Sequence, residues 1–325
     1  MNKKFLLPMI LATTLLIGAC ATPTAQPTAV PAPTAAPSLA PTAAPSPTPM
    51  TFVDALKRTV KLSKPAQRIV SIAPSNTEIL FAVGAGKQVV GRDDLSDYPA
   101  EAKNVTSIGS TFKKLNTEAV VALKPDLVLA ASLTAPEQVK SLEDVGITVY
   151  VLGNPKDLEG LYQNLTIVGQ LTGHEEDAKK LNESLKKRVS AVTDKTKSVT
   201  TKPKVFYEID GSDPLKPWTT GVGTFIDTLI TMAGGQNVGA SLKDPFAQMS
   251  SEEVVKQNPD IILLGDAKFG TTVESVGKRA GWNAIAAVKT NKVLPFDDDL
   301  ASRPGPRLVD GLEALAKVLQ PDLFK

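Results

Sequence analysis

The side chains able to do chemistry are unevenly distributed along this chain. Its 325 residues include one cysteine, Cys20, and one histidine, His174. One cysteine cannot form an intramolecular disulfide or a multi-cysteine zinc site, and one histidine disfavours a histidine-rich metal site. The G-x-S-x-G signature of serine hydrolases and the G-x-x-x-x-G-K-[ST] phosphate loop are both absent. We therefore expect no enzyme, no resident cofactor and no metal.

Binding chemistry is better represented, because aromatic residues gather in loops that follow the expected strands. Although aromatic residues make up only 5% of the chain, these loops contain Tyr98, Phe112, Trp218, Phe246, Phe269 and Phe296. Aromatic walls suit a large, flat ligand, since they bury much area with little loss of rotamer entropy. Arg92, Arg303 and Arg307 lie in the same loops and could meet carboxylates, phosphate or amide oxygens. The alternatives are local loop packing for each aromatic ring and a solvated helix start for Arg307.

Alternating strands and helices must position these loops. Short β-branched runs stand at 68–73, 89–91, 126–130 and 147–152, and helical patterns stand at 76–86, 116–125, 136–146 and 157–171. This alternation predicts parallel βαβ units. Ligands of such sheets bind beyond the carboxyl ends of the strands, where the aromatic loops begin.

A different pattern covers 172–198, which we predict to be one long helix. Thr172 and Glu175 have the spacing of a capping box. Apolar residues then recur at spacings of three and four, which leaves a narrow apolar stripe among charges; they are Ala178, Leu181, Leu185, Val189 and Val192. A thin stripe is typical of a helix that links two lobes.

The first half of the chain is then repeated. The segments "TEAVVALKPDLVL" (117–129) and "SEEVVKQNPDIIL" (251–263) match in residue type at seven of thirteen positions without a gap. Such self-similarity indicates an internal duplication. The predicted fold is α/β, with two Rossmann-like lobes that have central, mostly parallel sheets, a single long α-helix between them, and a ligand cleft. We expect the lobes at 52–172 and 200–325 and the linking helix at 173–199.

The N-terminus has the features of an export signal. Lys3 and Lys4 precede an apolar run, and Ile17-Gly18-Ala19-Cys20 resembles a lipobox, in which the cysteine is lipidated. The alternative is an ordinary signal peptide with cleavage near Ala19 or Ala21. We predict a signal peptide at 1–19 and a lipidated Cys20 with an Ala/Thr/Pro-rich tether at 20–51, which place the protein outside the cytoplasm on a bacterial membrane. The net charge of +2 gives no reason to expect nucleic acid.

From about residue 52 to 325 the chain resembles the helical-backbone class (class III) of ABC-importer substrate-binding proteins, which serve cobalamin, ferric siderophores and haem. The residues that carry this resemblance lie in 58–110 and 116–130. The resemblance implies a monomer without enzymatic activity, whose partner is an ABC permease dimer. It also implies that Glu118 and Glu252, at matched positions of the repeat, dock onto the permease. The alternative is that each acid only complements the dipole of its helix.

Within this family the cobalamin-binding members resemble the chain most. That resemblance implies that Tyr98 contacts a corrin ring, and that Phe112, Trp218 and Phe246 stand where those members also have aromatic residues. Phe296 and Arg303 complete the expected ligand site. Ala131 departs from the pattern, because a tryptophan stands there in those members. We expect cobalamin or a related corrinoid, with a ferric siderophore or haem as the alternative.

Overall fold

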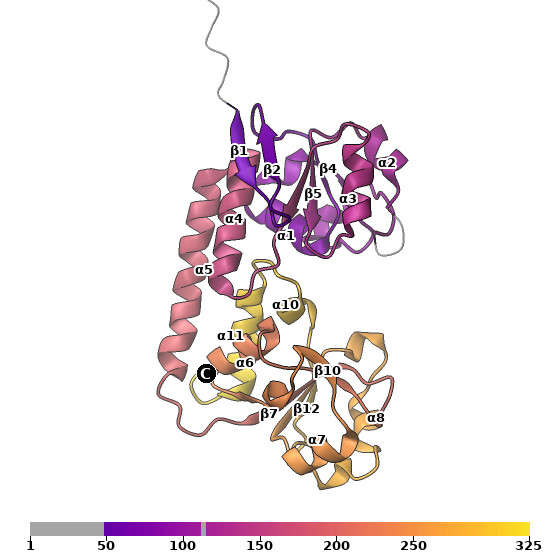
Figure 1. Ribbon diagram of the computed structural model, residues 1–325. Coiled ribbons are helices and arrows are strands. Elements are labelled where there is room, and N and C mark those ends of the chain that lie inside the picture. Colours follow the sequence, from indigo (N-terminus) through magenta and orange to yellow (C-terminus); the bar gives the residue numbers. More distant parts are fainter. Residues whose placement is uncertain (1–48, 112–114) are drawn as a thin grey trace, which may run out of the picture. The chain divides into compact units, whose positions relative to one another are not determined.

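The computed structural model describes residues 49–111 and 115–325. The predicted signal peptide, Cys20, nearly all of the predicted tether and Phe112 lie outside these residues. The described part from residue 49 onward belongs to one unit, Pro47–Lys325. In Figure 1 the indigo to magenta elements of this unit surround one sheet, and the orange to yellow elements surround another.

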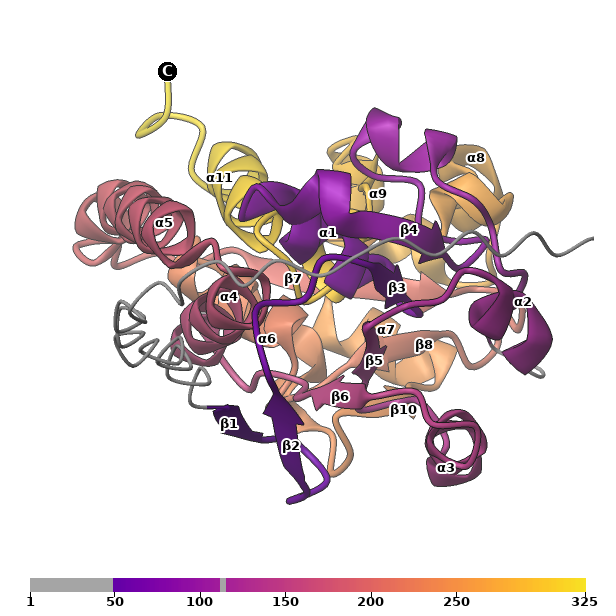
Figure 2. The same ribbon diagram turned by 90° about the horizontal axis from the view of Figure 1, so that it is seen from above.

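The sheet of the first lobe is parallel throughout, with strand order β4-β3-β5-β6. Its strands are β3 (Ile69–Ser71), β4 (Val89–Arg92), β5 (Leu127–Ala131) and β6 (Val149–Leu152), and a separate hairpin of β1 (Met50–Val53) and β2 (Thr59–Leu62) precedes them. The helices are α1 (Pro74–Ala82), α2 (Thr117–Ala122), α3 (Pro136–Glu143) and α4 (Leu158–Thr172), with short 3₁₀ turns at Ala85–Gln88 and Ala100–Asn104. Figure 2 shows α1 and α4 on one face of this sheet and α2 and α3 on the other, as their buried side chains also require.

The second lobe has a mixed sheet of order β10-β8-β7-β11-β12, with β9 paired to β7. Its strands β7 (Lys204–Asp210), β9 (Gln236–Asn237), β11 (Ile261–Leu264) and β12 (Val293–Pro295) are parallel, whereas β8 (Trp218–Thr220) and β10 (Phe246–Gln248) run antiparallel at one edge. The helices are α6 (Phe225–Met232), α7 (Ser251–Gln257), α8 (Val273–Gly277), α9 (Ala286–Lys289), α10 (Asp299–Ser302) and α11 (Leu308–Leu319), with 3₁₀ turns at Val238–Ser241, Ala267–Phe269 and Trp282–Ala284. This sheet is therefore less regular than the first.

The long helix α5 (Glu175–Thr196) leads from the first lobe to the second and packs on α4 and α11. Arg188 of α5 fastens it to α11, because its Nε lies 2.8 Å from Glu313 Oε1 and its Nη2 lies 2.5 Å from Asp310 Oδ1. The predicted capping box at the start of this helix is wrong. Thr172 ends α4, and its hydroxyl donates to the carbonyl of Val168 at 2.7 Å.

Gly173 is the reason that Thr172 cannot be the cap. It adopts φ +78°, the left-handed conformation that ends a helix and that glycine tolerates best. The chain therefore reverses at Gly173, and α5 begins at Glu175, two residues later than the predicted linking helix, with His174 as its N-cap.

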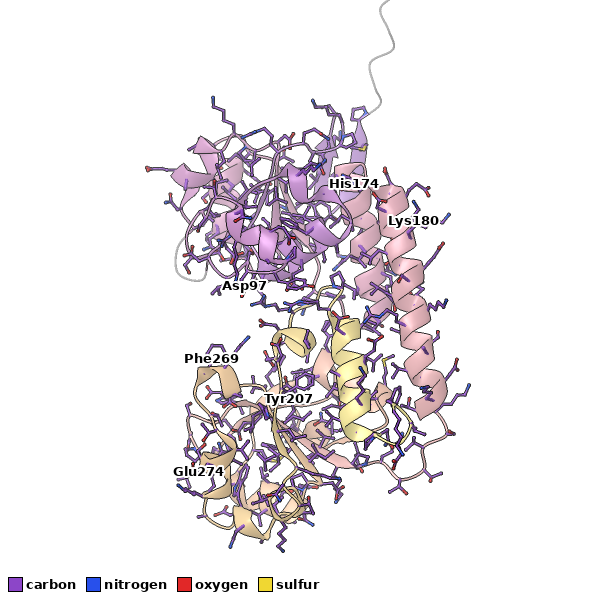
Figure 3. All side chains as sticks on the ribbon, turned by 180° about the vertical axis from the view of Figure 1, so that it is seen from behind. Asp97, His174, Lys180, Tyr207, Phe269 and Glu274 are labelled. Atoms are coloured by element: carbon purple, nitrogen blue, oxygen red, sulfur yellow. The ribbon has the colours of Figure 1, made fainter. Side chains whose placement is uncertain are left out.

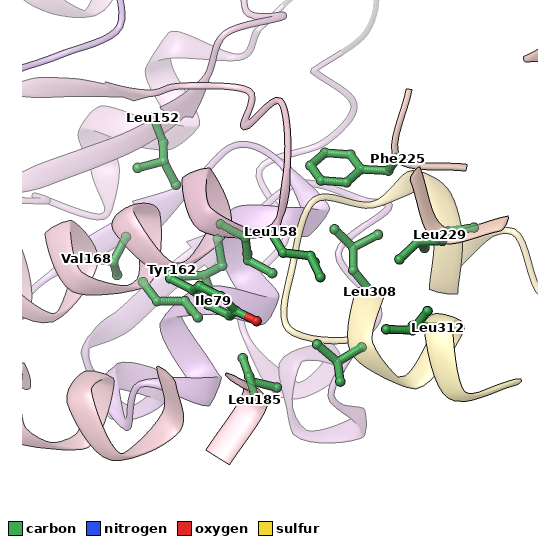
Figure 4. Close-up of a cluster of buried hydrophobic side chains, with 14 of the residues drawn as sticks. Ile79, Leu152, Leu158, Tyr162, Val168, Leu185, Phe225, Leu229, Leu308 and Leu312 are labelled. Carbon is green, nitrogen blue, oxygen red and sulfur yellow. The ribbon is translucent and has the colours of Figure 1, made fainter. Parts of the chain in front are cut away.

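One apolar cluster extends through both lobes along α5. Figure 4 shows Ile79 and Tyr162 of the first lobe, Leu185 of α5, and Phe225 and Leu308 of the second lobe within it. Each fully buried side chain of this kind contributes about 2 kcal/mol through removal of apolar surface from water. The α/β fold class with two sheets and a long helix is confirmed.

The repeated segments fold alike. Asn116 caps α2 by accepting from the amide of Ala119, and Ser250 caps α7 by accepting from the amide of Glu253. Each helix is followed by a non-glycine residue in the left-handed region, Lys124 at φ 47° and Asn258 at φ 50°. The sequence repeat is therefore a repeat of backbone conformation as well.

Candidate functional site

The most strongly connected polar side chains lie where the two lobes meet. Glu78 of α1 is buried, with a side chain 1% exposed. Arg307 of the second lobe donates to it at two points, Nε to Oε2 at 2.9 Å and Nη2 to Oε1 at 2.6 Å. Arg303 lies 3.4 Å from Glu78 Oε1 and donates to Asp97 Oδ1 at 2.8 Å. Two carboxylates of the first lobe thus face two guanidinium groups of the second.

A proline-rich turn places both arginines. Pro304, Gly305 and Pro306 separate Arg303, which ends α10, from Arg307, which precedes α11. Gly305 lies directly against the carboxylate of Glu78, since a Cβ on this glycine would stand 3.3 Å from Oε2. The rigid turn therefore brings both guanidinium groups to the same buried acid.

At this junction of the lobes, formed by Glu78, Asp97, Arg303 and Arg307, the opposite charges stabilise each other's ionised forms. Burial alone would raise the pKa of Asp97, but the hydrogen bond and charge of Arg303 outweigh it and hold this pKa below its usual value. Burial alone would lower the pKa of Arg303, yet Asp97 and Asp299 raise it. Asp97 and Arg303 are therefore both ionised at neutral pH.

Tyr98 joins the junction through Arg307, whose guanidinium carbon lies 4.0 Å from the centroid of the tyrosine ring. A cavity of about 330 Å³ opens here; its walls include Glu78, Phe81, Tyr98, Leu185, Arg188 and Arg307. Both lobes and α5 contribute to these walls. The volume is at the lower end of what small-molecule sites occupy.

A larger cavity of about 740 Å³ lies in the second lobe, beyond the carboxyl ends of β7 and β11. Its walls include the polar side chains of Asp210, Ser212, Asp266, Thr271, Ser275 and Arg279. Phe269 adds a ring that is 80% exposed. Figure 3 shows Phe269 and Asp97 on the margins of the two lobes that face each other.

The structure brings two predicted aromatic residues together. Trp218 starts β8 and Phe246 starts β10, and these strands pair so that Trp218 is opposite Gln248 and Phe246 is opposite Thr220. The two rings therefore belong to the same face of the strand pair, at diagonal positions. Trp218 is 41% exposed and Phe246 is 57% exposed, so both are accessible.

Phe296 and Arg303 are more enclosed than the other predicted ligand residues. Phe296 follows β12, is half-buried, and packs edge-to-face on Tyr207 with ring centroids 5.9 Å apart. Arg303 is already paired with Asp97, Glu78 and Asp299. Tyr98, by contrast, is 43% exposed and borders the smaller cavity.

The two acids expected to dock on a permease occupy equivalent places. Glu118 lies in the first turn of α2, and Glu252 lies in the first turn of α7. Both are exposed, and neither forms an ion pair with another described residue.

Glu78 and Asp97 did not emerge from the sequence as site residues. The available signal was that Glu78 is the only charged residue of α1, in a segment that is otherwise apolar or neutral. Arg92, which the sequence placed among possible ligand contacts, donates instead to the backbone carbonyls of Ala102 and Asp93, both at 2.8 Å.

Within residues 49–111 and 115–325, no helix has the length and apolar character that a membrane span requires. In the same ranges, no group of three or more His, Cys, Asp and Glu side chains is arranged to hold a metal ion.

A family model described as periplasmic binding protein matches residues 69–300. An ABC transporter substrate-binding lipoprotein of Bacillus subtilis, YvrC, itself uncharacterized, is 37% identical over 282 residues, which cover 85% of this chain and 87% of the relative. A cobalamin-binding protein of Halobacterium salinarum is 29% identical over 276 residues, which cover 82% of this chain and 73% of the relative.

Solved structures of periplasmic binding proteins also superimpose on this chain. The periplasmic haem-binding protein RhuT of Roseiflexus superimposes with a TM-score of 0.71 at 28% identity, over 80% of this chain and 100% of that one. The periplasmic vitamin B12-binding protein BtuF of Vibrio cholerae superimposes with a TM-score of 0.67 at 26% identity, over 79% of this chain and 98% of that one. Proteins of one architecture thus hold different tetrapyrrole ligands.

Proposed function

The chain belongs to the periplasmic binding protein family, and on this premise we propose that it captures cobalamin or a related corrinoid between its lobes and hands it to an ABC permease. The family resemblance noted in the sequence is confirmed, and the chain is an ABC transporter substrate-binding protein. The observation that carries the corrinoid proposal is the set of accessible rings, Tyr98 in one lobe and Trp218, Phe246 and Phe269 in the other.

Each proposed ligand residue has a physical role. Tyr98, Phe112, Trp218 and Phe246 would cover the apolar faces and edges of a large macrocycle. Phe296 would form part of the wall of the ligand site, where its packing on Tyr207 holds its ring in place. Arg303 would border the ligand while its charge remains balanced by Asp97 and Glu78. The cobalamin-binding relative at 29% identity supports this choice of ligand.

The alternative ligand is haem or a ferric siderophore. The likeness to a haem-binding protein of the same fold favours haem as the second candidate. Calorimetry can distinguish these ligands. The purified protein is titrated with cyanocobalamin, with haemin and with a ferric hydroxamate in separate experiments. Heat only with cyanocobalamin supports the proposal, whereas heat only with haemin or the hydroxamate contradicts it.

Two variants of Tyr98 sharpen this test. Tyr98→Ala removes the ring and should weaken cyanocobalamin binding about tenfold, because one aromatic contact is worth about 1 kcal/mol or more beyond its buried area. Tyr98→Phe retains the ring and serves as the matched control, with an expected change below about threefold. Equal affinities of the two variants would count against a ring contact.

Delivery would depend on Glu118 and Glu252. Both acids are exposed at matched positions of the repeat, as docking on a two-subunit permease requires. Glu118→Gln with Glu252→Gln should abolish uptake in cells and leave ligand affinity unchanged. Glu137, an exposed acid in the first turn of α3, gives the matched control, since Glu137→Gln should leave uptake intact. Full uptake by the double variant would contradict the docking role.

Attachment to the outer side of a bacterial membrane would depend on Cys20. The lipobox-like sequence and the Ala/Thr/Pro-rich tether at 20–51 support this part of the proposal. Cys20→Ser should release the protein from the membrane fraction and leave ligand affinity unchanged. A Cys20→Ser protein that stays with the membrane would contradict lipid attachment.

A further inference from the structure

The ring of Tyr98, one of the proposed ligand contacts of the first lobe, is held in place from the second lobe. Tyr98 lies between β4 and the 3₁₀ turn Ala100–Asn104 and is 43% exposed. Among the described residues, its hydroxyl forms no hydrogen bond and no other aromatic ring packs on it. The guanidinium carbon of Arg307 lies 4.0 Å from the centroid of the ring. The orientation of this ring therefore depends on a residue of the other lobe.

Arg307 is itself fixed by a buried acid. Its Nε and Nη2 donate to Oε2 and Oε1 of Glu78 at 2.9 and 2.6 Å. The side chains of Arg307 and Glu78 are 12% and 1% exposed. Guanidinium N–H bonds lie in the plane of the group, so this pairing leaves the flat face of Arg307 free to lie over the tyrosine ring. Glu78, Arg307 and Tyr98 thus form a continuous series of contacts from a buried acid to an accessible ring.

The same contacts argue against a direct role of Arg307 in ligand binding. To meet a ligand group with Nε or Nη2, Arg307 would have to give up its pair with Glu78. That exchange would leave a buried carboxylate with a weakened charge partner, which is costly. Tyr98 keeps accessible surface while the guanidinium lies over its ring. A ligand can therefore reach the ring without displacing Arg307.

We propose that Arg307 is a positioning residue for ligand binding, which holds the ring of Tyr98 in the orientation that the ligand meets and does not itself touch the ligand. This inference rests on the proposed function, because it takes Tyr98 as a ligand contact. Without the guanidinium the ring is free to adopt other orientations, and ordering it again opposes binding. A contact of this kind at an accessible site corresponds to about a two- to fivefold change in an equilibrium constant.

A double-mutant cycle on the full-length protein tests this role, with cyanocobalamin as the ligand and calorimetry as the measurement. Arg307→Gln should weaken binding about threefold when Tyr98 is present. In the Tyr98→Ala background the same substitution should change the affinity by less than about 1.5-fold, because the ring that Arg307 positions is gone. Equal effects of Arg307→Gln in the two backgrounds would overturn the inference, since Arg307 would then act independently of Tyr98.

Arg58→Gln is the matched control for the loss of an ion pair with a buried acid. Arg58 lies in the turn between β1 and β2 and donates to Asp54, whose side chain is 0% exposed, and to Glu143. All three residues belong to the first lobe. Arg58→Gln should leave the affinity for cyanocobalamin within about 1.5-fold. A loss equal to that of Arg307→Gln would overturn the inference, because general destabilisation would then explain both.

A second measurement uses the unaltered protein, so that it does not depend on the folding of a variant. Three of the four tyrosines, Tyr150, Tyr162 and Tyr207, are buried, so a soluble paramagnetic reagent should broaden the ring signals of Tyr98 alone among them. NOEs from these ring protons to the side chain of Arg307 should appear in the free protein and persist at saturation with cyanocobalamin. NOEs that are absent, or that are lost at saturation, would overturn the inference.

The two measurements separate this inference from the choice of ligand. If haemin binds and cyanocobalamin does not, the corrinoid proposal fails and the cycle is repeated with haemin. An effect of Arg307→Gln on haemin affinity that requires the ring of Tyr98 would then support the inference. Equal effects with and without that ring would overturn it for this ligand too.

Discussion

Glu78 and Arg307 form a two-point ion pair between the lobes, at 2.9 and 2.6 Å, although 229 positions separate them in the chain. All the charged partners of Glu78 belong to the other lobe, since Arg303 is its second contact. The same lobes share an apolar cluster along α5. Electrostatic and apolar contacts thus hold one arrangement of the lobes, in keeping with a single connecting helix.

The first prediction concerns Glu78→Gln. This change leaves the largely buried guanidinium of Arg307 without a charge partner, whereas Arg303 keeps Asp97 and Asp299. Removal of one member of a buried pair costs about 3 kcal/mol in the free energy of unfolding. Urea unfolding followed by circular dichroism measures it. Glu274→Gln is the matched control, because Glu274 pairs with Lys278 at the surface, where such a pair contributes about 0.5 kcal/mol. Equal losses in the two variants would contradict a structural role for the junction.

The second prediction concerns the stability of the fold at low pH. The pKa of Asp97 is lower in the folded protein than the unfolded value of about 3.9. Its pair with Arg303 therefore stabilises the fold above that unfolded value, and the stabilisation is lost as the pH falls through the folded pKa. Asp97 is 50% exposed, so we expect less than about 1 kcal/mol. The melting temperature of the Asp97→Asn variant should lie below that of the unaltered protein at pH 7, and the two melting temperatures should coincide near pH 2. A constant difference at both pH values would contradict this account.

Local patterns in the sequence predicted most of the fold. Strands such as β5 and β6 were recognisable because they are short, apolar and β-branched. Helices such as α4 stand where a helical pattern was predicted, at 157–171. The duplication was visible because caps and breakers recur at the same spacing. The start of α5 was predicted two residues too early, because Gly173 and not Thr172 decides where the chain reverses.

The site was only partly predictable, for a different reason. The sequence predicted that Tyr98, Trp218 and Phe246 lie in loops that follow strands. Trp218 and Phe246 instead begin the short strands β8 and β10, and all three rings are accessible. Nothing local predicts that Glu78 meets Arg307, because the contact depends on how the two lobes pack. Nor does sequence position show that Phe296 is held against Tyr207. Contacts between distant elements follow from tertiary packing, which periodicity does not encode.

The third prediction uses the duplication. Asp126 accepts from the amides of Gln67 and Arg68 at 2.9 and 3.0 Å, just before β3, and Asp260 accepts from the amide of Lys204 at 2.8 Å, at the start of β7. Hydrogen bonds to a charged acceptor contribute about 2 kcal/mol each. Asp126→Ala should therefore lower the free energy of unfolding more than Asp260→Ala, which loses one such bond. Urea unfolding checks the order, and a larger loss for Asp260→Ala would contradict it.

The fourth prediction concerns the two tryptophans. Trp218 is 41% exposed, whereas Trp282 is fully buried and donates to the hydroxyl of Ser251. Acrylamide should therefore quench the fluorescence of Trp218 and spare that of Trp282. Under the proposed function, cyanocobalamin covers Trp218, so the acrylamide quenching constant should fall at least twofold once the ligand is bound. The lifetime form of the measurement removes the effect of light absorbed by the corrin.

Trp218→Phe is the control for this experiment, because only Trp282 then emits and acrylamide should have little effect with or without ligand. Phe at this position retains a ring, so the variant should still bind the ligand. If acrylamide quenches Trp218 equally in the free protein and in the saturated complex, Trp218 does not belong to the ligand site. In that case the strand pair β8–β10, with Phe246 beside Trp218, would lie outside the corrinoid contact and only Tyr98 and Phe269 would remain as its accessible aromatic walls among the described residues.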